Sequence, residues 1–444
     1  MNEIVNEPLV EVENPFPLDF PEDRVRVLVP ERINKIETGP EKSSFANSSI
    51  LIAAGMFAVT MSQPMSLKLP LRNFLKAELN VSPPAMASFF AISMLAWYFK
   101  PLAGILTDSV PLFGTRRKFY VILGAILAGA LYLLVGVIPR TYLSLLVTLI
   151  GVNTMTMVTS SVIGAISVEV GQRYHATGRI NSLRSAVVYA CRLLSGPLGG
   201  FLAMRALGYT ALFGSLVALS VIPFAWFLIQ EPPIEQKKSK PWIAIKVQFQ
   251  TLKKSKTLWS AGGLLFLFFI CPGFSTPLYY FQTDTLKLSQ QFIGTLSLLS
   301  GIFGIVGAGI YALLCRRVNL RILLYVSIVI SALSALGYLF YGSGTAAAII
   351  ESQAGLMGVI AELALFDFAT RATPRGSEGL GLGLMMTVRN LSMELSDIFG
   401  SWLIDKHHVS FFKLVWVNAG TTALVLFAIP FLPRILIEAR DGSP

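Results

Sequence analysis

Twelve apolar runs fill most of the chain, and they restrict it to the folds that a lipid bilayer accepts. The hydrocarbon core of a bilayer is about 30 Å thick, and a helix needs about 20 mainly apolar residues to cross it. The runs cover residues 47–69, 84–107, 119–138, 142–168, 179–205, 208–230, 258–283, 289–315, 319–342, 345–370, 378–404 and 409–434. The sequence therefore predicts an all-α membrane protein with twelve transmembrane helices.

The composition agrees with a membrane protein and excludes a soluble one. Of the 444 residues, 54% are hydrophobic and only 14% are charged, whereas about 25% of the residues of a soluble domain are charged. The net charge is +11. Because the basic residues lie mainly in the loops, we attribute this charge to membrane orientation and expect the lipid bilayer, not a nucleic acid, as the partner.

The basic loop residues fall mainly on one side of the predicted membrane. With the N-terminus inside, this side receives Arg116, Arg117, Lys118, Arg173, Arg179, Lys237, Lys238, Lys240, Arg316, Arg317, Arg321, Arg371 and Arg375. The other side receives only Lys68, Arg72, Lys76, Arg140, Arg205, Lys287, Lys406 and Lys413. Following the positive-inside rule, we expect both termini in the cytoplasm and the protein in the plasma or inner membrane.

The chain divides into two six-helix bundles joined by a long basic connection. The predicted parts are a disordered cytoplasmic arm (1–45), an N-terminal bundle (46–230), a cytoplasmic linker (231–257), a C-terminal bundle (258–436) and a cytoplasmic tail (437–444). In the linker, apolar residues recur at spacings of three and four among lysines: Trp242, Ile245, Phe249 and Leu252. This pattern predicts an amphipathic helix on the inner leaflet.

Charges avoid every third run. The third, sixth, ninth and twelfth runs carry none in their interiors. Charges within the membrane are costly and face a protein interior or a watery cavity. We therefore expect these four helices to face lipid and the other eight to surround a central cavity.

The loop between the second and third runs has an ordered set of glycine, acidic and basic residues. These are Gly104, Asp108, Gly114, Arg116, Arg117 and Lys118. Alone, the Arg-Arg-Lys sequence would indicate no more than a basic turn that sets topology. The whole set resembles the corresponding loop of the major facilitator superfamily, and its longer Asp-Ser-Val-Pro-Leu-Phe-Gly spacing resembles the folate–biopterin transporter branch.

The resemblance implies the major facilitator fold of two six-helix pseudo-repeats, and a gate at this loop. Asp108 is expected near the N-terminal end of the eleventh helix, around residues 377–383, where helix-end N–H groups favour an anion. Glu169, Arg184, Asp367 and Arg371 are expected to form gate or interface pairs near the cytoplasmic face, and the last two have the i, i+4 spacing of an ordinary helical pair. The chain departs from the branch in its fourth helix, where Ser160 and Gly164 stand at positions that usually carry aspartates.

The predicted substrate site combines three charges at mid-membrane depth with residues of the interrupted helices. Its members are Gln63, Arg192, Tyr279, Tyr280, Glu362 and Arg389. Arg192 and Arg389 are expected to point into one central cavity, with Glu362 close to Arg389. Proton coupling is expected through Glu362, Glu394 and Asp397. Ser62-Gln63-Pro64 and the Pro272–Gln282 segment interrupt helices at paired positions in the two halves, which is a pointer to a transporter's binding site. A purely structural Glu362–Arg389 bridge and simple helix kinks remain open as alternatives.

Enzyme, metal and cofactor signals are not found. The three cysteines, Cys191, Cys271 and Cys315, lie in apolar runs as expected for packing residues, and the histidines form no ligand cluster. Without a nucleotide-binding loop, ATP drive is not expected.

Two functions from different classes remain. The first is a secondary active transporter, working by alternating access as a monomeric symporter, for an anionic or pterin/folate-like solute coupled to protons. The second is a non-transporting member of the same fold that assists assembly of membrane pigment–protein complexes. The mid-membrane charges favour transport, because a scaffold has little reason to bear their cost.

Overall fold

A computed structural model gives the fold of the protein. It describes residues 45–100, 103, 107, 112–115, 117–174, 177–229, 250, 252–315, 317–374, 378–433 and 437–438. Residues 43–444 form one compact unit, and the described residues belong to it. Nearly all of the predicted arm and most of the tail and of the linker lie outside the described residues, so these domain assignments stay predictions.

The described part of the N-terminal half is helical. Its helices are α1 (Phe45–Ser62), α2 (Lys68–Ala77), α3 (Pro83–Ser93), α4 (Leu95–Tyr98), α6 (Lys118–Val137), α7 (Tyr142–Arg173), α8 (Thr177–Ala203), α9 (Leu207–Leu219) and α10 (Ile222–Leu228). Fully buried apolar side chains such as Phe89, Leu145 and Leu149 form part of its core.

The C-terminal half repeats the plan with a separate core around Leu324, Leu365 and Phe368. Its helices are α12 (Lys256–Phe269), α13 (Ser275–Tyr280), the π-helical turn η2 (Phe281–Thr285), α14 (Gln290–Leu314), α15 (Leu320–Leu336), η3 (Gly337–Phe340), α16 (Gly344–Arg371), α17 (Glu378–His407), α18 (Phe411–Leu424) and η4 (Val425–Phe431). Leu252 of the predicted amphipathic helix is buried in this core. The prediction that Leu252 contacts the lipid of the inner leaflet is therefore wrong.

Nine helices among the described residues are long and apolar enough to cross a membrane. The other three predicted crossings fall short for separate reasons. Residues 84–107 are split between α3 and α4 and are partly outside the description, and residues 258–283 are interrupted between α12 and α13. Helix α17 is continuous but carries Arg389, Glu394 and Asp397. The all-helical membrane architecture is confirmed, and the order of the helices is consistent with twelve crossings.

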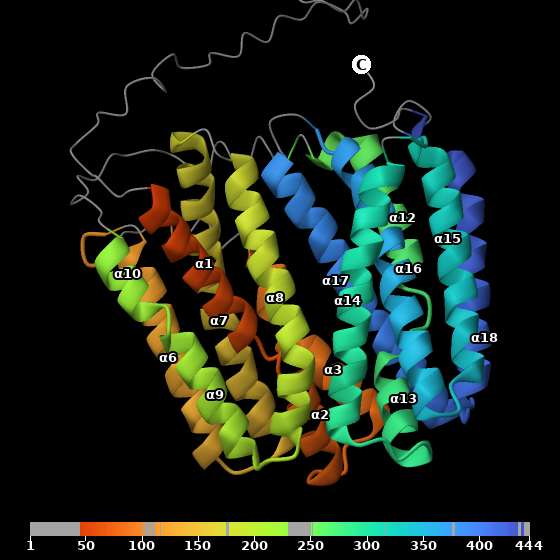
Figure 1. Ribbon diagram of the computed structural model, residues 1–444, viewed down its shortest axis with the longest axis horizontal. Coiled ribbons are helices and arrows are strands. Elements are labelled where there is room, and N and C mark those ends of the chain that lie inside the picture. The colour runs from red at the N-terminus through yellow and green to blue at the C-terminus, as the bar shows by residue number, and fades with distance from the viewer. Residues whose placement is uncertain are drawn as a thin grey trace, which may run out of the picture. The chain divides into compact units, whose positions relative to one another are not determined.

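The helices expected to face lipid lie at the two edges of the bundle. Figure 1 shows α6, α9 and α10 at one edge and α15 and α18 at the other. Large apolar side chains on them are exposed, among them Val137, Leu216, Leu333 and Trp416. These exposed surfaces agree with the absence of charge from the third, sixth, ninth and twelfth runs.

The two halves contact each other through α8 with α14 and through α3 with α17. Glycines allow the first contact to be close. A Cβ atom added to Gly196 would lie 2.5 Å from the carbonyl oxygen of Gly294, so neither position has room for a side chain. Small residues at a helix interface let backbones approach in this way.

The first and seventh crossings are both broken. Residues 63–67 separate α1 from α2, and residues 270–274 separate α12 from α13. Pro64 and Pro272 lie in these breaks, where a residue without an N–H group interrupts the helical ladder. The first run was expected to end at Leu69, but the chain continues as α2 to Ala77. Lys68, Arg72 and Lys76 therefore lie on the broken helix and not in a loop.

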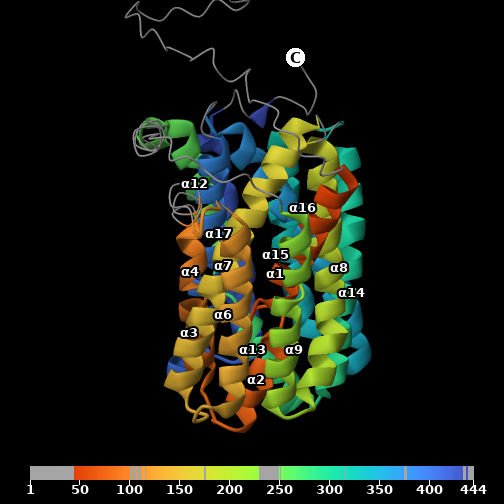
Figure 2. The same ribbon diagram turned by 90° about the vertical axis from the view of Figure 1, so that its left-hand side faces the viewer.

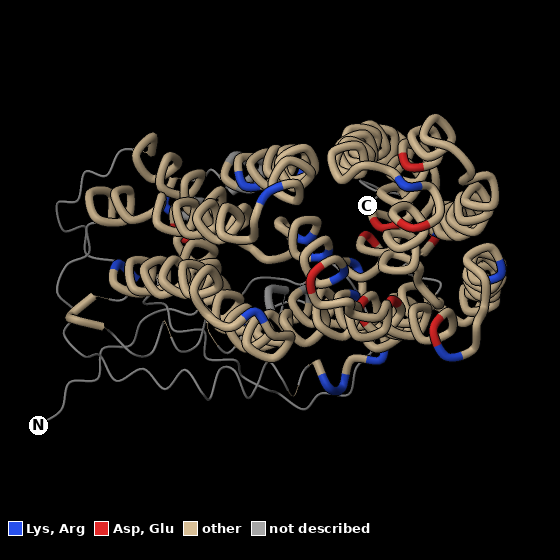
Figure 3. Tube along the Cα trace, turned by 90° about the horizontal axis from the view of Figure 1, so that it is seen from below, with Lys and Arg blue, Asp and Glu red and all other residues tan. Residues whose placement is uncertain are grey.

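The bundle has two ends, which we name by their loops. The motif end carries residues 112–115 and 117 and the described C-terminal residues 437–438, and the opposite end carries the turns 78–82, 286–289 and 341–343. Figure 2 shows α2, α3 and α13 together toward the opposite end. Seen from below, basic and acidic positions occur side by side where the halves meet (Figure 3).

Candidate functional site: a central cavity between the two halves

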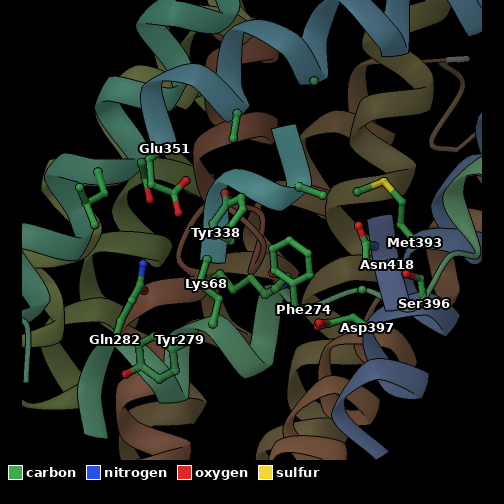
Figure 4. Close-up of a pocket in the computed structure, with 18 of the residues that line it drawn as sticks. Lys68, Phe274, Tyr279, Gln282, Tyr338, Glu351, Met393, Ser396, Asp397 and Asn418 are labelled. Atoms are coloured by element: carbon green, nitrogen blue, oxygen red, sulfur yellow. The ribbon is translucent and has the colours of Figure 1, made fainter. Parts of the chain in front are cut away.

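A cavity of about 670 Å³ lies between the halves, mostly within the C-terminal one. Its volume is in the range of about 300–1,000 Å³ that is typical of small-molecule sites. The N-terminal half contributes α2 with its preceding turn and α8, and the C-terminal half contributes all six of its crossings. Charged residues in the lining are Lys68, Arg72, Glu351 and Asp397. Figure 4 shows Glu351 and Asp397 on opposite sides of this pocket.

The basic side of the cavity comes from α2. Lys68 and Arg72 are four residues apart, so they share a face of the helix. The Nη2 atom of Arg72 donates hydrogen bonds to Ser275 Oγ at 3.0 Å and Thr276 Oγ1 at 3.2 Å. The Lys68 Nζ atom lies 5.0 Å from the centroid of the Phe90 ring. These contacts hold two cations at the cavity while leaving donor groups to spare, because Arg has five N–H donors and Lys three.

Two carboxylates on α17 balance these cations. Asp397 accepts hydrogen bonds from the Thr276 backbone N at 2.8 Å and from Thr276 Oγ1 at 2.6 Å. It thus caps the N-terminus of α13, where an anion is favoured. Glu394 is buried and lies within electrostatic range of Lys68 and Arg72. The net result is two positive and two negative charges in one buried cluster, which lowers the cost of placing charge inside a membrane.

The second carboxylate that lines the cavity, Glu351, is on α16 and has hydroxyl groups around it. The Tyr341 hydroxyl donates to Glu351 Oε1 at 3.3 Å, and Tyr338 also hydrogen-bonds to this carboxylate. Gln282 Nε2 donates to the Tyr341 hydroxyl oxygen at 2.6 Å. The rings of Tyr338 and Tyr341 stack with centroids 5.4 Å apart. The carboxylate is therefore fixed by a small network in the C-terminal half.

Aromatic rings cover the surface between the charged groups. Phe268, Phe269, Phe274, Tyr279 and Tyr338 line the cavity. Phe274 and Tyr338 meet edge to face with centroids 4.8 Å apart. Flat, apolar walls with a few polar groups are the usual construction of a site for a ring-containing ligand.

Of the predicted substrate residues, Tyr279 lines the cavity. Gln63 is half-buried in the turn after α1, where its carbonyl accepts the Ser66 N–H at 2.9 Å. The Tyr280 hydroxyl donates to the Val81 carbonyl oxygen, so it joins the halves at the opposite end. Arg192 is exposed, and its guanidinium lies 5.8 Å from the centroid of the Tyr189 ring.

Arg389 and Glu362 form the ion pair that the sequence predicted, with Arg389 Nη2 and Glu362 Oε1 2.9 Å apart. Arg389 also lies over the Phe269 ring at 5.3 Å. The cavity lining includes neither member of this pair, nor Arg192. The expectation that both arginines point into one cavity is thus not met by the described cavity. The parts that Arg192, Arg389 and Glu362 play in cargo binding stay predictions.

The gate residues are described only in part. Gly104, Asp108 and Arg116 lie outside the described residues, and so does Ser377, so the expected contact of Asp108 is not described. Gly114 has a φ of +77° in the turn closed by Leu112 and Thr115, a conformation that favours glycine. Arg117 pairs with Glu169 across α6 and α7, and Lys118 Nζ lies 4.8 Å from the Trp226 ring.

Further charges near the motif end agree in part with the predicted gate pairs. Asp367 and Arg371 form the expected pair one helical turn apart, at 2.8 Å, and the Tyr311 hydroxyl donates to the same aspartate at 3.1 Å. Arg184 is half-buried, and its Nε has no hydrogen-bond partner among the described residues. The gating role of these residues stays a prediction.

The comparisons with known proteins fit this architecture. The BT1 family profile matches residues 65–441. The protein belongs to the BT1 family. The folate–biopterin transporter of Synechocystis sp. is 26% identical over 388 residues, which cover 83% of this chain and 77% of that protein. Folate transporter 1 of Plasmodium falciparum is 21% identical over 371 residues, or 79% of this chain and 72% of that one. These relatives are transporters and not enzymes.

Solved structures share the fold of the BT1-family chain. The nucleoside transporter NupG has a TM-score of 0.67 at 14% identity, covering 87% of this chain and 98% of that one. The D-xylose–proton symporter has a TM-score of 0.63 at 15% identity, covering 87% and 98%. The resemblance to the folate–biopterin branch and the major facilitator fold are therefore confirmed, and the protein is a multi-pass membrane protein.

The departure of this BT1-family chain in its fourth helix has a structural counterpart. Ser160 on α7 accepts a hydrogen bond from Lys100 Nζ at 2.8 Å, and the same ammonium lies 5.2 Å from the Trp97 ring. A Cβ atom added to Gly164 would meet nothing within 4 Å. A hydroxyl and an open space thus stand where the resemblance leads one to expect carboxylates.

Sequence reasoning missed the groups that make this cavity polar. Lys68 and Arg72 were assigned to a loop, although their spacing with Lys76 places all three on one face of a helix. Glu351 was overlooked, although an acidic residue within an apolar run is itself a signal of function. Gln282 lies at the end of the Pro272–Gln282 segment, which was predicted to interrupt a helix, but it was not included in the predicted site.

Proposed function

We propose that this BT1-family protein is a secondary transporter that moves an anionic pterin- or folate-like solute by alternating access. The observation that carries the proposal is the central cavity, which joins the Lys68 and Arg72 cations to a wall of aromatic rings. Anions pair with the cations, and a flat heterocycle packs against the rings. The names of the Synechocystis and Plasmodium relatives support this cargo class.

Contacts between the halves support a conformation closed at the opposite end. Arg72 bonds to Ser275 and Thr276, Lys76 pairs with Asp284, and Gln290 Nε2 donates to Asn73 Oδ1 at 3.0 Å. In the proposed cycle these contacts break when the cavity opens to that side. We place the motif end in the cytoplasm from the distribution of lysine and arginine, which makes this the inward-facing state.

The charge cluster supplies a mechanism for proton coupling. An arriving carboxylate competes with Glu394 and Asp397 for Lys68 and Arg72, and protonation of one acid releases a cation to the cargo. The Glu362–Arg389 pair is a second place where a proton would free an arginine. Since one chain supplies both sides of the cavity, we propose that a monomer carries out transport.

Uptake into proteoliposomes tests the proposal. Purified full-length protein is reconstituted, an inside-alkaline pH gradient is imposed, and radiolabelled folate, pterin-6-carboxylate and a nucleoside are supplied outside. We expect folate or the pterin acid to accumulate only with the gradient, and the nucleoside to remain outside. Failure of every solute to cross, with protein correctly inserted, would instead favour the assembly-factor alternative.

A further inference from the structure

Glu351 is a cavity carboxylate that is held by hydroxyl groups. Its described hydrogen-bond partners are the Tyr341 and Tyr338 hydroxyls, and no lysine or arginine among the described residues forms an ion pair with it. Lys68 and Arg72 lie near Asp397, on another side of the cavity, and near the buried Glu394 behind it. One side of the cavity therefore carries the cations Lys68 and Arg72, which can pair with an anion. The other side carries the Glu351 carboxylate, which can accept hydrogen bonds from N–H groups.

The network around Glu351 leaves part of its acceptor capacity unused. An ionised carboxylate has about four lone-pair positions, and the two tyrosine hydroxyls fill two. The Tyr341 hydroxyl oxygen already accepts from Gln282 Nε2 at 2.6 Å, which directs its proton to the carboxylate. Because Glu351 lines the cavity, the remaining lone pairs are available to a bound molecule.

We infer that Glu351 determines ring specificity by accepting two N–H groups from one edge of the cargo. This inference rests on the proposed function and assigns an orientation within the same site. A 2-amino-4-oxopteridine has adjacent donors, the 2-amino group and N3–H, and a carboxylate accepts both at once. The cargo ring lies against Phe274 and Tyr338, and its anionic tail points to Lys68 and Arg72.

The same geometry disfavours a ring with an oxygen in place of the amino group. A 2,4-dioxopteridine presents a carbonyl oxygen to the carboxylate, so one hydrogen bond is replaced by repulsion between two acceptors. Sites built to hydrogen-bond one group discriminate strongly against analogues that lack it. We expect a preference of about 10- to 100-fold, the range that follows from one charged hydrogen bond.

Competition binding with two matched acids tests the inference. Pterin-6-carboxylate and lumazine-6-carboxylate share shape and tail charge and differ in the 2-amino or 2-oxo group. Full-length wild-type protein in nanodiscs is expected to bind the pterin acid more tightly by about tenfold or more. In Glu351→Gln the amide offers one donor and one acceptor, so the preference is expected to fall to about one or to reverse.

Two more variants keep the test decisive. Glu351→Asp retains the carboxylate on a shorter side chain and is expected to keep the pterin preference with weaker affinity. Glu438→Gln removes an exposed carboxylate that lies 3.8 Å from Arg321 and is not part of the cavity lining, so this variant is expected to match the wild type. The preference of the wild type is measured whether or not Glu351→Gln folds.

The outcomes separate the two proposals. If the wild type binds both acids equally, or if Glu351→Gln keeps the wild-type preference, the role of Glu351 is overturned while the cargo class stands. If the wild type binds neither acid, the proposed cargo class fails, and the inference that depends on it fails too.

Discussion

The first and seventh crossings are broken at corresponding places but bring different chemistry to the cavity. After its break, the first crossing continues as α2 with Lys68, Arg72 and Lys76 on one face. The seventh continues as α13 and η2 with tyrosines, Gln282 and Asp284. One segment therefore supplies cations, and the other supplies rings and acceptors.

The difference shows how a duplicated backbone becomes an asymmetric site. Arg72 donates to hydroxyls at the start of α13, and Lys76 pairs with Asp284 at the end of η2. Two of the three basic residues of α2, Arg72 and Lys76, thus meet acceptors on the broken partner. The breaks allow the two segments to approach, and the unlike side chains give the contact its direction.

The largest expected effect comes from removing the cation that joins the two segments. In Arg72→Ala the proposed charge-assisted hydrogen bonds to the carboxylate of the cargo are lost, and such bonds contribute about 1.5–3 kcal/mol. We therefore expect the affinity for pterin-6-carboxylate to fall by about 10- to 100-fold. Equilibrium titration of the protein in nanodiscs with pterin-6-carboxylate measures this affinity. Arg72→Lys keeps the charge without the planar fork and should be intermediate.

Lys413→Ala serves as the matched control, because Lys413 is exposed at the start of α18. Its affinity should equal that of the wild type. An Arg72→Ala protein that binds as tightly as this control would remove α2 from the binding site.

The second prediction concerns the cap on the seventh crossing. Asp397→Asn removes the anion that accepts from Thr276, and loss of a helix cap costs about 1–2 kcal/mol. We expect a lower thermal unfolding midpoint in detergent micelles. Asp405→Asn on the same helix removes a carboxylate 3.9 Å from Lys406 and should unfold near the wild-type temperature; identical midpoints for both variants would contradict the capping role.

The smallest effect is expected at the Lys76–Asp284 pair, because Asp284 is 58% exposed and exposed pairs contribute about 0.2–1 kcal/mol. Lys76→Asp should shift the population toward opening at the opposite end by about two- to fivefold. The rate of maleimide labelling at Ile293→Cys, a position that is buried in the described conformation, reports this opening in a protein without the native cysteines. The double exchange Lys76→Asp with Asp284→Lys should restore the original rate, and a double variant that labels as fast as the single one would contradict the pairing.

The fold was largely predictable from the sequence because its signals are local. Apolar runs of sufficient length, charge-free third, sixth, ninth and twelfth runs, and prolines at paired positions each depend on neighbouring residues alone. The boundary after Leu69 was wrong because α2 is amphipathic: hydropathy falls at Lys68 although the helix continues.

The cavity was less predictable because it depends on which helices meet. The Glu362–Arg389 pair could be predicted, since both residues lie at similar depth on adjacent crossings. The contacts of Arg72 with Thr276 and of Asp397 with the same residue join segments more than 100 positions apart. Arg192 has the depth expected of a cavity residue, but depth does not fix the direction of a side chain around its helix.

The central claim is that the cargo binds between α2 and the C-terminal half, and a structure of the protein with bound pterin-6-carboxylate tests it most directly. We predict the ligand carboxylate within hydrogen-bond distance of Lys68 or Arg72, and the ring against Phe274 and Tyr338 with its amino edge at Glu351. A ligand held instead by Arg192 and Arg389, or bound outside the cavity, would contradict the account.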